Sequence, residues 1–213
     1  MKDLIAALRP TLISLLVLTG LLGIAYPFVI GGIAAALFPD QARGSLVRDG
    51  AGEVRGSALL GQPFDDPAYF WGRPSAVAGG QATTSGSTNA GPSGFIGATG
   101  ALGPNPALTG AVRARIRALR AADPGNADPV PVDLVTASAS GLDPHITPAA
   151  ASYQLRRIAR ARGVPAGRIR ELVERHVEER TLGVLGERRV NVLRLNLALD
   201  ASLVPRARGT PRP

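Results

Sequence analysis

The chain has 213 residues, and its 24 Lys and Arg residues against 16 Asp and Glu residues give a formal net charge of +8. It contains no Cys, which excludes disulfides, thiol catalysis and Cys-based zinc sites, and it has no Lys after Lys2 to serve a P-loop. Aromatic residues make up only 4%, so the arginines lack the interleaved stacking residues typical of nucleic-acid binding, and we expect no nucleic-acid partner.

An uncharged stretch over residues 10–39 is the first predicted element. No Lys, Arg, Asp, Glu or His lies between Arg9 and Asp40. About 20 apolar residues in a helix cross a hydrocarbon core roughly 30 Å thick, so the stretch predicts a transmembrane helix after a short segment 1–9. A cleaved secretory signal is the alternative, but its apolar region would be only about 7–15 residues long, which favours an uncleaved anchor.

The predicted span carries small residues along one side. They recur every three or four positions, which places them on one face of a helix. They are Gly20, Gly23, Pro27, Gly31 and Ala35. Small residues let a second helix approach closely inside a bilayer, so we predict a packed partner helix and a kink at Pro27, although Gly is also simply common in membrane spans. The short N-terminus before a long trailing domain favours a cytoplasmic N-terminus and an extracytoplasmic domain.

A single mixed α+β soluble domain is expected over residues 40–204. Short apolar pairs around the Asp49-Gly50 turn predict two strands within residues 40–61. Four aromatic residues then cluster between two prolines. They are Phe64, Tyr69, Phe70 and Trp71. Such a cluster is either a core anchor or an interface hot spot; we favour the core anchor and expect Arg73 to be the surface contact.

The middle of the domain is predicted to contain a loop, a helix and a strand. Residues 78–106 are almost wholly Gly, Ser, Thr, Asn, Ala and Pro, with too little apolar surface to order by themselves, which predicts a long loop. Residues 106–122 show a helical apolar face with the arginines mostly off it. That face consists of Leu108, Val112, Ile116 and Leu119. The apolar residues Val132, Leu134 and Val135 predict a short buried strand.

Two further helices and a strand are predicted for the last third. Thr147 is the expected N-cap of a helix over residues 148–162. A second helix is predicted over residues 165–180. Leucines alternate over residues 190–199, which predicts a strand, and the tail 205–213 is expected to be disordered.

Candidates for independent chemistry are few. Ser138, His145 and Asp133 could form a hydrolytic triad, but no G-x-S-x-G surrounds the serine. Asp143 and His145 could supply two ligands of an incomplete metal site, although a capped turn beside a helix N-terminus is the simpler interpretation. We therefore expect a membrane-anchored domain that works through a partner. An anchored periplasmic hydrolase and a polyanion-binding envelope protein are the alternatives.

Several motifs in register resemble one known family. They are GSALLGQPF (56–64), YFWGRPSA (69–76), SGSTNAGP (85–92), PVDLVTASASGLDPHITPAAA (131–151), IARARGV (158–164) and RVNVLRLNLALD (189–200). Together with the single N-terminal span, they make the chain similar to the C subunit of the bacterial Kdp potassium-transporting P-type ATPase. Residues 93–103 look inserted relative to that family.

The resemblance implies a non-catalytic subunit of the bacterial inner membrane, assembled with a potassium-pathway subunit and an ATP-hydrolysing subunit. It also implies that the chain stabilises the complex and raises the ATP affinity of the ATP-hydrolysing subunit. No cofactor is expected to be bound firmly, but ATP is possible in the complex, through a family-proposed nucleotide contact that matches Gln154. Because a domain outside the membrane cannot touch cytoplasmic ATP, we prefer structural coupling or a lid near the potassium entrance.

Partner contacts are expected from the small-residue face of the span and from polar loops of the soluble domain. The loop residues are Tyr69, Phe70, Arg73, Ser75, Asn89, Thr136, Ser138, Ser140, Asp143 and His145. We expect neither a catalytic residue nor a metal ligand in this chain.

Overall fold

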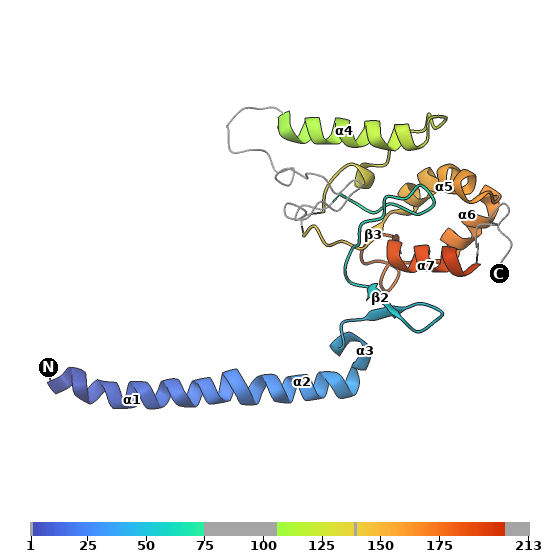
Figure 1. Ribbon diagram of the computed structural model, residues 1–213. Helices are drawn as coiled ribbons and strands as arrows, with labels where there is room; N and C mark the ends of the chain where they lie inside the picture. Colours follow the sequence, from blue (N-terminus) through green and yellow to red (C-terminus); the bar gives the residue numbers. More distant parts are fainter. Residues whose placement is uncertain (1, 75–105, 139, 203–213) are drawn as a thin grey trace, which may run out of the picture. The chain divides into compact units, whose positions relative to one another are not determined.

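The computed structural model describes residues 2–74, 106–138 and 140–202 (Figure 1). The chain divides into two compact units, residues 1–46 and 47–213, and each is described by itself. The loop predicted from residue 78 onward, up to residue 105, and the predicted tail lie outside the described residues.

The first unit is dominated by one long apolar helix. α1 (Lys2–Leu18) passes through a π-helical segment, η1 (Thr19–Ala25), into α2 (Tyr26–Leu37), and the short helix α3 (Pro39–Ala42) follows. The stretch Leu8–Leu37 is 30 residues long, apolar enough to cross a membrane, and exposed along its length. The apolar helix predicted from the uncharged stretch is therefore confirmed.

The π-helical segment lies directly before Pro27. Proline has no backbone N–H, so the usual α-helical bond from that position is missing. The turn before it is wider than an α-helical turn, and the backbone N–H of Tyr26 donates to the carbonyl of Leu21, five residues back. The helix then continues through Pro27 as α2, so the predicted disturbance at the proline takes the form of this wider turn.

A two-stranded hairpin opens the second unit. β1 (Leu46–Arg48) pairs with β2 (Val54–Ser57). The Asp49 carboxylate organises the turn, because its Oδ1 accepts the backbone N–H groups of Ala51 at 2.9 Å and Glu53 at 3.0 Å. The two strands predicted around this turn are confirmed.

A small antiparallel sheet and three helices form the centre of the second unit. β5 (Arg189–Asn191) lies between β3 (His145–Ile146) and β4 (Val177–Glu178), and Val190 pairs with both Ile146 and Val177. The helices α5 (Pro148–Arg162), α6 (Ala166–Arg175) and α7 (Val192–Ser202) contribute most of the buried apolar side chains. The expected mixed α+β domain is confirmed.

The aromatic cluster lies in the core of this domain. Phe70 is fully buried and Trp71 is 8% exposed, so the core-anchor prediction is confirmed. The most deeply buried aliphatic side chains of the same core are Leu134, Ile146, Ile158, Ile169, Val190, Leu195 and Leu199. Phe70 and Trp71 therefore pack among residues that come mostly from the C-terminal third of the chain.

Helix α4 (Pro106–Ala122) has the predicted bounds, but its inward face differs from the prediction. Arg115 is buried, as is Leu119, although the arginines were expected mostly off the apolar face. Arg115 Nε donates to the Leu134 carbonyl at 3.1 Å, so a backbone oxygen replaces water around this cation.

Helix α5 starts and ends as predicted. Thr147 Oγ1 accepts the backbone N–H of Ala150 at 3.1 Å, and Gly163 ends the helix with φ +65°. The prediction for the next helix is wrong beyond Arg175, where α6 ends. The pairing of Val177 with β5 takes the chain out of the helix at this point.

The strand predicted over residues 190–199 is wrong except at its first positions, because β5 ends at Asn191 and α7 begins at the next residue. Besides Leu193, four buried positions of α7 have helical i, i+3, i+4, i+7 spacing. They are Val192, Leu195, Asn196 and Leu199. Leu197, which a strand would place beside Leu195, is only half-buried.

The strand predicted over residues 132–135 is also wrong. The chain forms a 3₁₀ turn, η2 (Val132–Leu134), with Val132 exposed and Leu134 fully buried. Asp133 Oδ2 accepts the backbone N–H of Thr147 at 2.7 Å, and this bond closes the turn against the start of α5.

Two single variants, Leu195→Ala and Leu197→Ala, are compared to test helix α7. We expect Leu195→Ala to lower the free energy of unfolding by about 2–5 kcal/mol, because the side chain is fully buried, and Leu197→Ala by about 1 kcal/mol or less. Chemical denaturation of the full chain in detergent measures both. Equal losses would contradict the helix, because only a strand places the two leucines on one face.

Candidate functional site

The segment 66–73 lies between helices α5 and α7. It turns over residues 66–69, where the Tyr69 N–H donates to the Asp66 carbonyl at 3.1 Å, and beyond this turn side chains rather than strands bond the backbone of Phe70 and Trp71. Asn196 of α7 serves Phe70: its Oδ1 accepts the Phe70 N–H at 2.9 Å and its Nδ2 donates to the Phe70 carbonyl at 3.0 Å. Gln154 of α5 serves Trp71 in the same way, at 2.8 Å and 3.1 Å. Successive residues of an extended chain direct their polar groups to opposite sides, so one helix satisfies each. We call this arrangement the amide clamp.

Two arginines of α5 bond the rest of the segment. Arg157 donates from Nη1 to the Pro67 carbonyl at 2.7 Å and from Nη2 to the Tyr69 carbonyl at 3.0 Å. Its guanidinium lies over the Trp71 ring, 4.1 Å from the centroid. Arg162 Nε donates to the Ala68 carbonyl at 2.8 Å. Burial lowers the pKa of Arg157 to about 10, which still leaves the side chain protonated at neutral pH.

Gln154, the residue that matches the family-proposed nucleotide contact, is 1% exposed. Its Nε2 donates to the carbonyls of Trp71 and Ala150, and its Oε1 accepts from the Trp71 N–H and from Arg157 Nη2 at 2.6 Å. An amide side chain has two donors and two acceptor positions, so all of its capacity is used inside the fold.

A polar cluster joins the end of the aromatic segment to strand β3. Arg73 Nη1 donates to Asp143 Oδ2 at 2.9 Å, and Asp143 Oδ1 accepts the backbone N–H of His145 at 3.0 Å. The His145 ring has Nδ1 3.4 Å from Asp143 Oδ1 and Nε2 3.7 Å from Glu178 Oε2. Hydrogen bonds from His145, and then from Arg73, lower the pKa of Asp143 to about 2. The structure thus brings together three predicted contact residues.

The serine and threonine candidates have separate local roles. Thr136 Oγ1 donates to the Val132 carbonyl at 2.7 Å, and Ser140 Oγ accepts the Leu142 N–H at 3.2 Å. Ser138 is buried, and its backbone N–H donates to the Pro74 carbonyl at 3.3 Å. Two other predicted residues, Ser75 and Asn89, lie outside the described residues.

The three residues of the hydrolytic alternative are not arranged as a triad. Both ring nitrogens of His145 face carboxylates, while Asp133 accepts the Thr147 N–H at the start of α5. In a triad the histidine would bond the serine on one side and the aspartate on the other. The geometry of the described residues therefore gives the hydrolase reading no support.

The small residues of the N-terminal helix have open space around them. At Gly20 and Gly31 an added Cβ would meet nothing within 4 Å, and at Gly23 it would meet only Thr19 Cγ2 of the same helix at 3.8 Å. Gly20 and Gly23 both lie in the π-helical segment, which the sequence pattern did not predict.

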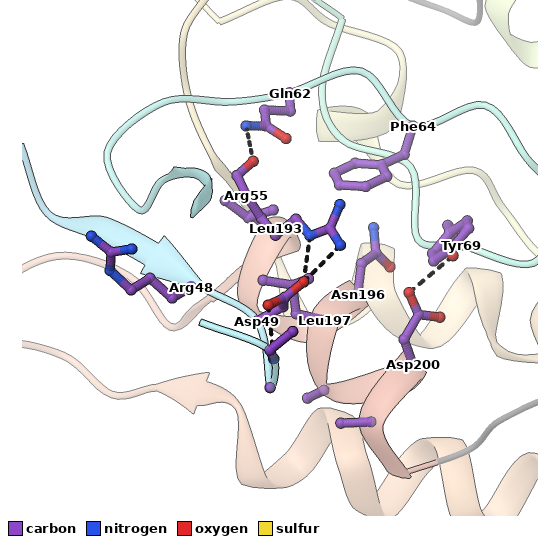
Figure 2. Close-up of a pocket in the computed structure, with 14 residues that line it drawn as sticks. Arg48, Asp49, Arg55, Gln62, Phe64, Tyr69, Leu193, Asn196, Leu197 and Asp200 are labelled. Carbon is purple, nitrogen blue, oxygen red and sulfur yellow. Dashed lines mark hydrogen bonds and ion pairs between the residues drawn. The ribbon is translucent and has the colours of Figure 1, made fainter. Parts of the chain in front are cut away.

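A pocket of about 830 Å³ lies between the β1–β2 hairpin, the segment 62–69 and α7 (Figure 2). Arg55 Nε donates to Asp49 Oδ2 at 2.7 Å, and the Tyr69 hydroxyl donates to Asp200 Oδ2 at 2.9 Å. Figure 2 shows both pairs on the pocket lining. Tyr69 is the one predicted contact residue on this lining, so the pocket and the polar cluster are different places on the domain.

Sequence reasoning missed most residues that hold the aromatic segment. Asn196 could have been found, because it belongs to the helical spacing of α7. Arg157 bonds the Tyr69 carbonyl, 88 positions earlier in the chain, and Arg162 bonds the Ala68 carbonyl, 94 positions earlier. No local sequence pattern predicts contacts over such separations.

Comparison with known proteins decides the family. The model of the KdpC family, described as "K+-transporting ATPase, c chain", matches residues 8–201. The chain belongs to the KdpC family. The resemblance inferred from the motifs is confirmed.

Named members of the KdpC family are similar over most of the chain. A protein of Sorangium cellulosum (strain So ce56), named "Potassium-transporting ATPase KdpC subunit", is 60% identical over 203 residues, covering 93% of this chain and 100% of the relative. A protein of the same name from Polaromonas naphthalenivorans (strain CJ2) is 58% identical over 197 residues, with 91% and 94% covered. A third, from Geobacter sulfurreducens, is 51% identical over 200 residues, with 93% and 98% covered.

Gln154→Ala and Asn196→Ala test the amide clamp. Each leaves a buried backbone N–H and carbonyl without partners, so we expect each to lower the free energy of unfolding by about 2–5 kcal/mol. Ser152→Ala, an exposed position on α5, is the matched control and should change it by less than about 0.5 kcal/mol. Losses no larger than the control's would show that the clamp is dispensable.

Asp143 makes the stability of the domain depend on pH in the acidic range. Because the pKa of Asp143 falls from its ordinary value of 3.8 to about 2 on folding, its contribution is complete above 3.8 and is lost as the pH falls through about 2. The shift corresponds to roughly 2 kcal/mol at neutral pH. We expect Asp143→Asn to flatten the loss of stability over this pH range, measured by denaturation at a series of pH values. Asp65→Asn, at an exposed carboxylate, should retain the wild-type slope.

Proposed function

We propose that this chain is the non-catalytic accessory subunit of an ATP-driven potassium uptake pump. Its family is described as the c chain of a K⁺-transporting ATPase, and relatives are named as the KdpC subunit of a potassium-transporting ATPase. In this proposal the apolar helix spans the bacterial inner membrane once, with its N-terminus in the cytoplasm and the α+β domain outside. Its partners are the potassium-pathway subunit and the ATP-hydrolysing subunit.

The observation that carries the proposal, beside the family, is the open small-residue face of the N-terminal helix. The helix has exposed apolar side chains over 30 residues. A Cβ added at Gly20 or at Gly31 would meet no other atom within 4 Å. Inside a bilayer, helices associate through close backbone approach at small residues, because lipid already satisfies apolar side chains. A helix of a partner subunit is the occupant that this face suits.

We further propose that the chain stabilises the pump and raises its ATP affinity through structural coupling. Gln154 already makes four hydrogen bonds within the core, so using it for ATP would require the amide clamp to open. Coupling needs only a domain that keeps its shape while it holds a partner, and the amide clamp supports such rigidity.

Gly23→Leu combined with Gly31→Leu tests the packing of the span. The added side chains would keep a partner helix from approaching, so we expect the recovery of the other pump subunits with this chain to fall at least about ten-fold. The measurement is affinity purification of the full chain from membranes in mild detergent.

Gly32→Leu is the matched control, because its position neighbours Gly31 along the helix but points to another side, and an added Cβ there also meets nothing within 4 Å. This variant should retain the wild-type recovery. Undiminished recovery with the double variant would contradict the packing proposal, and absence of pump subunits beside the wild-type chain would contradict the proposed function itself.

A further inference from the structure

The hairpin that joins β4 to β5 ends in three exposed aliphatic residues. Leu182 is 86% exposed, Val184 74% and Leu185 60%. Single exposed leucines are normal on a soluble surface, but here three large apolar side chains within four positions are exposed at one turn. We call these three residues the apolar tip.

The backbone at the tip is a poor choice for a leucine. Val184 N–H donates to the Thr181 carbonyl at 3.3 Å, and the two residues between them have φ +55° at Leu182 and φ +76° at Gly183. Thr181 also pairs with Leu185 in an antiparallel bridge, so Leu182, Gly183 and Val184 form the loop. A positive φ within such a loop favours Asn, Asp or Gly. Leu182 therefore occupies a left-handed position that disfavours it, and its side chain gives almost no contact to the fold in return.

Three charge pairs link the two arms of the hairpin that carries the tip. Arg189 Nε lies 3.0 Å from Glu178 Oε2 and Arg188 Nη2 lies 2.8 Å from Glu179 Oε1. Arg180 Nη2 lies 3.0 Å from Glu187 Oε2, and this pair is the nearest of the three to the turn in sequence. Three arginines and three glutamates neutralise one another there, so the flanks of the tip carry no net charge.

From these features we infer that the apolar tip docks into an apolar recess on another subunit of the potassium-transporting ATPase. The inference rests on the proposed function and adds the residues of one contact. Leu182 has a backbone conformation that disfavours leucine, and its side chain is almost wholly exposed to water. This side chain therefore does not stabilise the described part of the chain. A preorganised hairpin loses little freedom on binding, and a small apolar anchor surrounded by neutral polar groups fits a recess on a protein.

The charges of the hairpin argue against a bilayer as the occupant. Segments that bind anionic lipid surfaces carry unpaired Lys or Arg beside their apolar residues. Here each flanking arginine is paired with a glutamate, and such carboxylates would have to approach the lipid headgroups together with the tip. A neutral protein surface imposes no such cost.

Leu182→Asn separates docking from folding. Asn suits the left-handed position, so we expect the melting temperature of the full chain in detergent to stay the same or rise. Binding of that detergent-solubilised chain to pump complex prepared without it should weaken roughly ten-fold or more, because a buried leucine is lost. Leu182→Met, which keeps an apolar side chain, should retain most of the wild-type affinity.

Val132→Asn is the control, since Val132 is 71% exposed but lies on the 3₁₀ turn η2. It should bind like the wild type. Wild-type affinity in Leu182→Asn overturns the docking inference and leaves the proposed function standing. Failure of the wild-type chain to bind the pump complex overturns the proposed function.

Photo-cross-linking identifies the occupant. Val184→benzoylphenylalanine in the full chain, illuminated in native membranes, should form an adduct with a second polypeptide of the ATPase. Adducts confined to lipid or to a second copy of this chain, or no adduct at all, would overturn the inference.

Discussion

The soluble domain depends on the satisfaction of one buried, extended piece of backbone. The segment that carries Phe70 and Trp71 enters the core without a neighbouring strand, yet buried N–H and carbonyl groups must find partners. Asn196 and Gln154 each supply one donor and one acceptor, and Arg157 bonds the carbonyls just before them. Helices α5 and α7 are thereby fixed to the same stretch of chain from opposite sides.

This arrangement also supports the proposed role of the domain as one that holds a partner. The buried polar side chains of the amide clamp are used up in bonding the backbone, and Arg73, just beyond it, is tied to Asp143. The pocket beside α7 likewise has its carboxylates occupied by Arg55 and Tyr69. Among the described residues, the open face of the N-terminal helix and the apolar tip are surfaces that the fold leaves exposed.

The sequence was most informative where local chemistry decides the structure. Thr147 and Gly163 mark the ends of α5 through capping, and the Asp49 turn sets the first hairpin, so both were predictable. Helix α7 was mistaken for a strand because Leu193, Leu195 and Leu197 alternate with a period of two, although Val192, Leu195 and Leu199 also fit a helical period. The buried arginines could not be predicted, since their partners are backbone carbonyls brought near only by the complete fold.

The amide clamp has a consequence for the order in which the polypeptide can mature. Phe70 and Trp71 receive their backbone partners from residues 126 and 83 positions later. During synthesis the N-terminal part of the chain is made first. Phe70 and Trp71 therefore lack their final neighbours until helix α7 has been made. A product that stops before Asn196 would expose them permanently, which gives cellular quality control a simple hallmark of an incomplete molecule.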